Sequence, residues 1–304
     1  MRFKVGNMDP VLDSNEDSKQ ESSVEDDDVD NAYAIKWDEN ASWQSLSESL
    51  WKLIETAVCE IQSRHKERDW IYLDIGSGPG NITNLIAEYF HYFKTVEPNS
   101  SYYREYDGKT FDGHSGYLGN IGEIIQNVDS DSFKVKDLKF DLITCIHTWY
   151  YIEIADYEET LKKLYRLLSD DGGTLIIAVA PKFRDRTSDW SQMMRYFSGE
   201  YFDAASSILS ICETFEDCKI EIYDEETSFD NEYASVDEAV DTMLWNLMEE
   251  LSFCRKYKVD IQSEAVAAKM LRSYLQQHCV DSENGQCKVS ATVGHVVITK
   301  CQRS

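Results

Sequence analysis

The sequence predicts an α/β fold in which a mostly parallel sheet with an antiparallel edge is flanked by helices and joined to a helical cap. Short apolar runs alternate along the middle of the chain with segments whose apolar residues recur at helical spacing. A glycine-rich turn joins the first of these runs to a helical segment. The later part of the chain is mostly helical in period and ends in another apolar run, which we expect to close the sheet edge.

Each element follows from a local pattern. Apolar residues within 46–61 recur with helical period, and the run 71–75 is short, apolar and bounded by a turn, as a buried strand is. Helical period resumes at 82–89 after the glycines, and residues 170–173 mark a turn before a further apolar run. The same criteria predict strands at 94–97, 140–146, 174–180, 219–223 and 292–299, and helices at 157–168, 236–254 and 263–278.

The composition favours one large globular domain in the cytoplasm. The 304 residues are 42% hydrophobic, enough to bury a substantial core. The net charge of −26 disfavours binding to nucleic acid, which requires Lys and Arg to neutralise phosphates. The eight cysteines form no C-x-x-C pair, which favours reduced thiols and no bound metal. Without an apolar run long enough for a membrane helix or the layout of a signal peptide, we expect a cytoplasmic monomer.

Residues 1–30 differ from the rest of the chain in composition. They hold ten of the 56 acidic residues and few apolar ones. Such a segment buries too little apolar surface to offset its conformational entropy, so we expect a disordered acidic tail. Residues 31–304 are expected to form a single domain, whose helical cap comprises approximately residues 31–65, 184–217 and 230–280.

The motif most directly linked to chemistry runs from Asp74 to Gly80 and reads D-I-G-S-G-P-G. Gly76, Gly78 and Gly80 let the backbone turn tightly after a strand and approach a ligand closely. Glu97, at the end of the next predicted strand, is placed to accept both hydroxyls of a ribose. The alternative is a turn that merely joins strand to helix. The combination with Glu97 favours a cofactor site.

The predicted arrangement is Rossmann-like, and dinucleotide enzymes share it. Their fingerprint, G-x-G-x-x-G, places a pyrophosphate at a helix N-terminus. The loop here reads G-S-G-P-G after an acid, which looks like the first motif of class I methyltransferases. That motif binds the amino-acid part of S-adenosyl-L-methionine, so we favour methyl transfer over hydride transfer.

Three further stretches carry a family resemblance: V-E-P at 96–98, I-H-T-W-Y-Y at 146–151 with the helix and strand of 164–179, and 244–253. On these stretches the chain, from about Trp37 to its C-terminus, resembles the histamine N-methyltransferase family. The resemblance implies a class I methyltransferase fold with a helical substrate-binding cap. It also implies a cofactor site lined by Gly76, Glu97, Tyr102, Gly122 and Ile146.

The same resemblance implies an aromatic cage for an amine substrate beneath the cap, and aromatic faces suit a cationic or imidazole-bearing ligand. The matching positions are Tyr150, Tyr151, Trp190, Met194, Tyr201 and Phe253. For any one of them, an ordinary core role is the alternative.

The polar residues that anchor histamine in the family are replaced here. A Glu, a Gln and an Asn of the family pattern fall on Ser42, His147 and Ala291. Losing a carboxylate partner for an ammonium removes about 1.5–3 kcal/mol of interaction. Glu39 lies close to Ser42 in the sequence and is a candidate substitute. The methyl acceptor is therefore either a histamine-like amine or another small metabolite.

His147 directly follows a predicted strand, where it is a candidate hydrogen-bond partner or base for the methyl acceptor. A histidine satisfied by backbone groups at a strand end is the alternative. Methyl transfer to nitrogen requires neither a metal nor a nucleophilic side chain, and the sequence shows no motif for either. A non-catalytic module that keeps the cofactor fold remains the third hypothesis.

Overall fold

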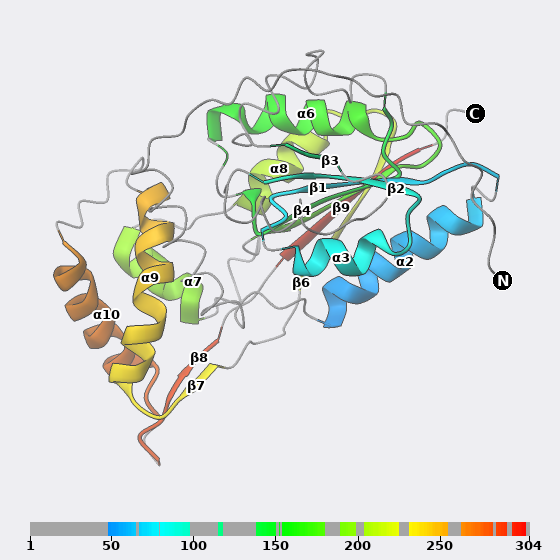
Figure 1. The fold of residues 1–304 in the computed structure, drawn as a ribbon. Helices are drawn as coiled ribbons and strands as arrows, with labels where there is room; N and C mark the ends of the chain where they lie inside the picture. The colour runs from blue at the N-terminus through cyan, green and yellow to red at the C-terminus, as the bar shows by residue number, and fades with distance from the viewer. Residues whose placement is uncertain are drawn as a thin grey trace, which may run out of the picture.

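The structure is a computed structural model. It describes residues 48–64, 67–78, 80–97, 115–117, 138–149, 152, 154–179, 189–198, 204–224, 231–254, 263–281, 284–290 and 294–301. At its centre lies a seven-stranded sheet in the order β3-β2-β1-β4-β5-β9-β6 (Figure 1). The strands are β1 (Ile71–Ile75), β2 (Tyr92–Val96), β3 (Ser115–Tyr117), β4 (Leu142–Ile146), β5 (Thr174–Val179), β6 (Cys218–Asp224) and β9 (Gly294–Lys300).

The register places the ends of the parallel strands at one edge of the sheet. Strands β1 to β5 pair in parallel, with Ile75 opposite Val96 and Ile146 opposite Ala178. Strand β9 then runs antiparallel between β5 and β6. The carboxyl edge of the parallel strands is where ligands bind in open α/β sheets, so this edge is where the site is sought.

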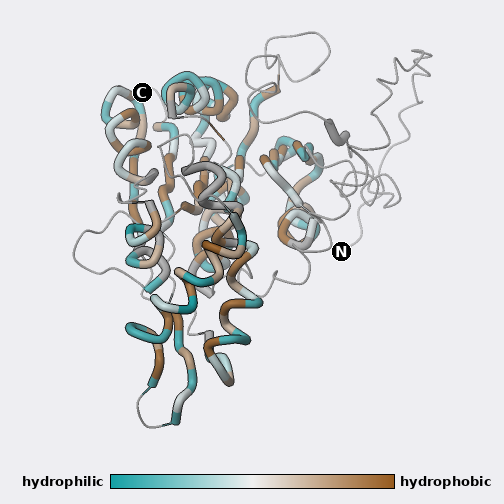
Figure 2. Tube along the Cα trace, turned by 90° about the vertical axis from the view of Figure 1, so that its left-hand side faces the viewer, coloured by the Kyte–Doolittle hydropathy of each residue, from teal (hydrophilic) through white to brown (hydrophobic). Residues whose placement is uncertain are grey.

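Two helical layers cover the two faces of the sheet (Figure 1). On one face, α2 (Glu48–Arg64) and α3 (Asn81–Ala87) pack against alternate strand residues such as Tyr72, Ile146 and Ala178. On the other face lie the 3-10 turn η4 (Ile154–Asp156), α6 (Tyr157–Leu167) and α8 (Ala204–Cys212). Figure 2 shows apolar and hydrophilic segments alternating along the helices, as expected for helices with one buried face.

A separate helical unit with its own core lies beyond the carboxyl edge of the sheet (Figure 1). It comprises α7 (Asp189–Ser198), α9 (Val236–Cys254), α10 (Glu264–His278) and the small antiparallel pair β7 (Asn231–Tyr233) and β8 (Cys287–Val289). Its buried residues include Met193 of α7, Met243 of α9 and Leu271 of α10. Helix α10 begins with Ser263, whose side chain accepts a hydrogen bond from the N–H of Val266, a standard N-cap. We call this unit the cap.

The predicted fold class is confirmed, and so is the antiparallel edge formed by the last two predicted strands. The predicted extent of the cap needs a correction. Residues 31–65 and 184–217 were assigned to it, but α2 and α8, which lie within those ranges, pack on the sheet. The apolar sides of α2 and α8 are buried against strand residues of the sheet. The predicted tail, residues 1–30, lies outside the described residues.

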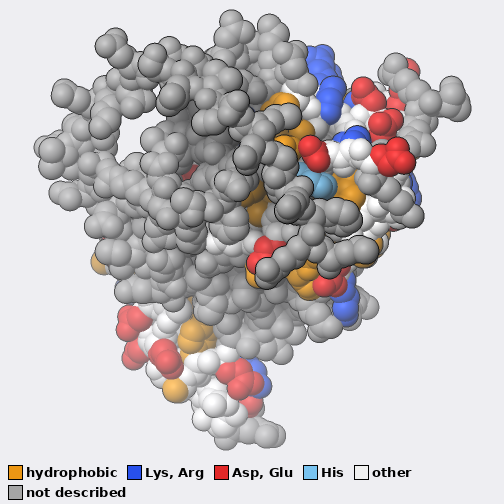
Figure 3. Space-filling view, turned by 45° about the vertical axis from the view of Figure 1, so that its right-hand side comes forward, with side chains coloured by type: hydrophobic (Ala, Val, Ile, Leu, Met, Phe, Trp, Pro, Cys, Tyr) orange, Lys and Arg blue, Asp and Glu red, His pale blue; other side chains and the backbone are white. Residues whose placement is uncertain are grey.

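The described surface carries charges of both signs. In the coloured part of the face shown in Figure 3, acidic side chains lie among Lys and Arg. Helix α6 illustrates the pattern, with Glu158 paired to Lys162 and Glu159 to Lys163 one turn later. Pairs of this kind at the surface of a helix contribute little stability, because water and salt screen them. Of the helices that the structure describes, none has the length and apolar character needed to cross a membrane.

Candidate active site

The glycine loop connects β1 to α3 at the carboxyl edge. Its backbone bends back over β2, because the N–H groups of Gly76 and Ser77 both donate to the carbonyl of Val96, at 2.7 and 3.3 Å. Gly76 has φ +73°, and a Cβ there would lie 2.3 Å from the side chain of Thr148. Glycine is therefore required at 76 by both the backbone conformation and the close approach of Thr148.

Gly80 closes the loop and starts α3. It has φ +82°, and its carbonyl accepts the first helical hydrogen bond from Asn84 at 2.9 Å. Gly78 also has a positive φ, +52°. Three glycines in left-handed conformation thus shape one short turn, in which backbone without a side chain is presented at Gly76, Gly78 and Gly80. Such a turn fits a cofactor whose amino-acid part lies against the loop.

Glu97 follows β2 and lies beside this loop. It is buried, and its carboxylate Oε2 accepts a hydrogen bond from the N–H of Gly78 at 2.6 Å. Hydrogen bonds from N–H groups to a carboxylate are of the stronger, charge-assisted kind. The structure therefore brings together Glu97 and the glycine loop, as the sequence predicted, and fixes the carboxylate at the carboxyl edge.

Asp74 lies beneath the loop rather than on its surface. One carboxylate oxygen accepts from Thr83 of α3 at 2.5 Å, and the other accepts from Thr144 of β4 at 2.6 Å. The hydroxyl of Tyr72 lies 2.7 Å from Thr144 and extends this buried chain. Burial raises the pKa of Asp74, while the two threonine hydroxyls act in the opposite direction. Asp74 thereby ties β1, β4 and α3 together under the loop.

Thr148 fastens the loop to the neighbouring strand. Its Oγ1 lies 2.9 Å from the carbonyl oxygens of both Ile75 and Ile146, the last residues of β1 and β4. Ile146, a predicted cofactor contact, is buried at the end of β4 on the face of α2 and α3. The two strand ends are thus held at a fixed separation at the base of the site.

His147 occupies an unusual backbone conformation directly after β4. Its φ is +53°, and its N–H donates to the carbonyl of Ala178 at 3.2 Å. Left-handed backbone in a residue with a side chain costs about 1–2 kcal/mol and is frequent at functional sites. Burial, followed by the charge of His295, lowers the pKa of His147 to about 4. A base with a pKa near the operating pH was one prediction for His147, and this low pKa does not suit that role.

Within the cap, the start of α7 is joined to the end of β8 by a clamp between Asp189 and Ser290. Asp189 Oδ2 accepts from the N–H and the hydroxyl of Ser290, at 2.9 and 2.8 Å, and Ser290 Oγ accepts from the N–H of Asp189 at 3.0 Å. Asp189 opens α7, directly before Trp190, and Ser290 follows β8, directly before Ala291. The clamp therefore links two chain positions at which substrate residues were predicted.

For three of the predicted substrate residues the structure describes the position in a helix, and other predicted residues lie outside the described part of the chain. Trp190 and Met194 are one turn apart on α7, and Phe253 is near the end of α9. The predicted residues outside the described part of the chain are Ser42, Tyr102, Gly122, Tyr150, Tyr151, Tyr201 and Ala291. The sequence reasoning missed Thr83, Thr144 and His295, which no local motif marks.

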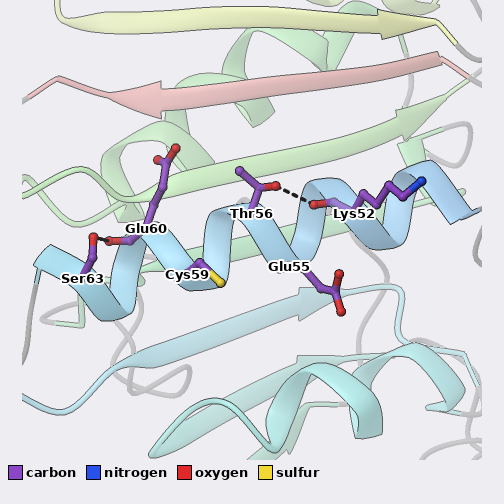
Figure 4. Close-up of a pocket in the computed structure, with 6 residues that line it drawn as sticks. All are labelled: Lys52, Glu55, Thr56, Cys59, Glu60 and Ser63. Carbon is purple, nitrogen blue, oxygen red and sulfur yellow. Dashed lines mark hydrogen bonds between the residues drawn. The ribbon is translucent and has the colours of Figure 1, made fainter.

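A surface groove of about 590 Å³ lies elsewhere, along the solvent side of α2 (Figure 4). Its lining residues all come from that helix and are mostly polar. Two of its hydroxyls are already used within the helix, since Thr56 donates to the carbonyl of Lys52 and Ser63 to that of Glu60. The groove therefore offers few unused polar groups, and it includes no residue of the glycine loop.

The sheet order, the loop D-x-G-x-G-x-G after β1 and the carboxylate after β2 define a class I methyltransferase fold. The chain belongs to the methyltransferase domain family, which matches residues 50–214, more than half of its length. Its methyl donor is S-adenosyl-L-methionine.

The chain is also similar, at low identity, to several solved structures. One is a putative sarcosine dimethylglycine methyltransferase from Galdieria sulphuraria, with 13% identity, a TM-score of 0.48, and coverage of 91% of this chain and 100% of that chain. Another is the N-methyltransferase NodS from Bradyrhizobium japonicum, with 14% identity, a TM-score of 0.45, and coverage of 66% and 89%. No curated protein matches the sequence. None of these comparisons singles out the histamine N-methyltransferases.

Proposed function

We propose that this methyltransferase transfers the methyl group of S-adenosyl-L-methionine to a nitrogen atom of a small, histamine-like amine in the cytoplasm, and that it acts as a monomer. The observation that carries the proposal is His147. Its imidazole, neutral at physiological pH and half-buried, follows the strand next to the glycine loop. A neutral ring nitrogen at this edge accepts a hydrogen bond from an N–H group without repelling a cationic substrate.

The residues present fit the cofactor. Gly76 and Gly78 present backbone without side chains, and Glu97 offers a carboxylate for the two ribose hydroxyls. We assign Asp74 and Gly80 the task of shaping the loop, because Asp74 is buried under it and Gly80 turns the chain into α3. Tyr102, Gly122 and Ile146 complete the proposed cofactor site.

The bound cofactor supplies a methyl group on a sulfonium, which is reactive enough to need no metal. The protein contributes by holding the acceptor nitrogen in line with that methyl group and by excluding water. The carboxyl edge supplies His147, and the cap supplies Trp190 and Met194 of α7 and Phe253 of α9. Ser42, Tyr150, Tyr151, Tyr201 and Ala291 are the other proposed substrate residues.

The aromatic cage receives support from the clamp. Because Asp189 and Ser290 are joined by three hydrogen bonds, the start of α7 lies next to the segment that leads into β9. From Ser290 to Gly294 the chain spans four residues, or at most about 14 Å. The start of α7 is therefore at most about 14 Å of chain away from Gly294, at the carboxyl edge.

Methyl transfer from labelled S-adenosyl-L-methionine to a panel of small amines, including histamine, tests the proposal. Glu97→Gln removes the charge that would bind the ribose, and we expect cofactor affinity to fall by about tenfold or more, the loss of one hydrogen bond to a charged group. Glu88→Gln, at the exposed end of α3, is the matched control and should leave affinity unchanged.

Three results are distinguishable. Turnover of histamine or a related amine, with weaker cofactor binding in Glu97→Gln but not in Glu88→Gln, supports the proposal. Turnover of a non-amine metabolite alone would keep methyl transfer and reject the substrate class. Tight cofactor binding without turnover of any substrate would favour a non-catalytic module.

A further inference from the structure

The sheet has a topological switch point between β1 and β4. From β1 the chain runs outward to β2 and β3, and it then returns to β4 on the other side of β1. The helix that follows β1, α3, covers one face of the sheet, whereas α6, which follows β4, covers the opposite face (Figure 1). The two connections therefore diverge at the carboxyl ends of β1 and β4, and ligands of open α/β sheets bind in the crevice between them.

Thr148 bridges the base of this crevice. The ladder between β1 and β4 ends at Asp74 and Thr144. Among the described strands, the later residues pair only outward, Ile75 with β2 and Ile146 with β5. The Thr148 hydroxyl lies 2.9 Å from the carbonyl oxygens of both Ile75 and Ile146, and it has one proton to share between them. A buried side-chain hydroxyl thus takes the place of the backbone ladder where the two strands separate.

Each side of the crevice also has an anchor that does not involve Thr148. On the side of β2, the N–H of Gly76 donates to the Val96 carbonyl at 2.7 Å, and this half carries the proposed cofactor site. On the side of β5, the N–H of His147 donates to the Ala178 carbonyl at 3.2 Å, and this half carries the proposed acceptor site. Thr148 therefore joins two halves that are each held in place by a different neighbouring strand.

The side chain of Thr148 also packs directly on the glycine loop. A Cβ on Gly76 would lie 2.3 Å from the Thr148 methyl carbon, so the threonine fills the space that a side chain at 76 would need. The methyl group sets how closely Thr148 approaches the loop, and the hydroxyl binds the two strand ends. These two contacts fix the separation of the halves at the level of the site.

We infer that Thr148 is a positioning residue, which sets the distance between the cofactor half and the acceptor half so that the acceptor nitrogen lies in line with the methyl group. This inference rests on the proposed function, since it places the acceptor at His147. In the transfer, the nitrogen lone pair forms the new N–C bond, the C–S bond breaks with its electron pair on sulfur, and the amine proton leaves for solvent. The rate depends steeply on distance, because a misplacement of about 1 Å can cost about 100-fold.

Thr148→Val and Thr148→Ser separate the hydroxyl from the methyl group. Valine keeps the shape but puts a carbon in place of the hydroxyl, and a carbon requires about 3.3 Å or more from each carbonyl oxygen. We expect the single-turnover rate of methyl transfer to fall by about tenfold or more in Thr148→Val. The cofactor Kd and the acceptor KM should change much less than the rate, because each half keeps its own anchor. Thr148→Ser keeps the hydroxyl and should retain a rate near that of the wild type.

Thr95→Val is the matched control for the chemical change. It makes the same replacement on β2, at a buried hydroxyl that has no hydrogen-bond partner within the described residues, and should leave the rate unchanged. Urea denaturation shows whether each variant is folded. If Thr148→Val does not fold, Thr148→Ala removes the hydroxyl without placing a carbon there, and the same loss of rate is expected.

A bisubstrate ligand supplies a readout that does not depend on turnover. In this probe the acceptor amine is linked through a short carbon chain to the sulfur atom of S-adenosylhomocysteine, so tight binding requires both halves of the site at the correct separation. Its Kd in calorimetry should rise in Thr148→Val by about the factor by which the rate falls. The Kd of S-adenosylhomocysteine alone should stay near the wild-type value, and Thr148→Ser should preserve both constants.

The possible failures are distinguishable. An active wild-type enzyme whose Thr148→Val variant transfers the methyl group at the wild-type rate would overturn this inference alone. Equal losses in the rate and in the affinity for S-adenosylhomocysteine would also overturn it, because Thr148 would then merely support the loop. A wild-type protein that methylates no amine would reject the proposed function, and this inference with it.

Discussion

Thr144→Val tests how strongly the buried carboxylate of Asp74 depends on its hydroxyl donors. Valine matches threonine in shape, so the substitution removes the bond to Asp74 and the acceptor for Tyr72 without creating a cavity. A hydrogen bond to a charged group contributes about 1.5–3 kcal/mol, and one between neutral groups about 1 kcal/mol. We therefore expect the free energy of unfolding to fall by about 2–4 kcal/mol at neutral pH.

Thr95→Val is the matched control. Thr95 stands opposite Asp74 on β2 and is equally buried, but within the described residues its hydroxyl has no hydrogen-bond partner. Replacing that hydroxyl with a methyl group should be neutral or slightly stabilising. Urea denaturation of both variants measures the difference.

The loss of stability in Thr144→Val should depend on pH in a defined direction. Because burial raises the folded-state pKa of Asp74, its ionisation weakens folding as the pH rises from the ordinary value of 3.8 through the folded-state value. Thr144 offsets part of that cost by stabilising the carboxylate. The penalty of Thr144→Val should therefore shrink at acidic pH, where Asp74 is protonated. Equal penalties for the two variants, or a penalty independent of pH, would refute this reasoning.

Two further predictions concern the loop and the clamp. Gly76→Ala and Gly285→Ala introduce the same Cβ at the same φ of +73°, but only Gly76 faces Thr148, at 2.3 Å, whereas Gly285 faces open space. Gly285→Ala should cost about 1–2 kcal/mol of stability, and Gly76→Ala clearly more, with weaker cofactor binding in calorimetry. Ser290→Ala should destabilise by about 1–2 kcal/mol and raise KM for the acceptor while the cofactor Kd stays constant. A larger change in the cofactor Kd than in the KM for the acceptor would contradict the assignment of the clamp to the cap.

The parts of the fold that could be predicted are those specified by local patterns. The run 71–75 is apolar and ends at a glycine turn, so both the strand and the loop follow from neighbouring residues. Glu97 was predictable because the end of the next strand has a fixed place beside that loop. By contrast, β3, β7 and β8 have only three residues each, too few to show a period.

The unpredicted parts depend on long-range contacts. Thr83 and Thr144 are ordinary residues of a helix and a strand until the fold places both against Asp74. His295 gains its neighbour only through the register of β9 with β5. The assignment of residues 184–217 to the cap was wrong for α8 because an apolar helical stripe does not reveal which surface covers it.

The position of β9 has a consequence for the assembly of the sheet. β9 follows both β5 and β6 in the chain, yet it lies inside the sheet, between them. Until it is inserted, β5 has an unpaired edge, and β6 lacks the partner with which it pairs among the described strands. A truncation before residue 294 would therefore leave the edge of β5 exposed to aggregation.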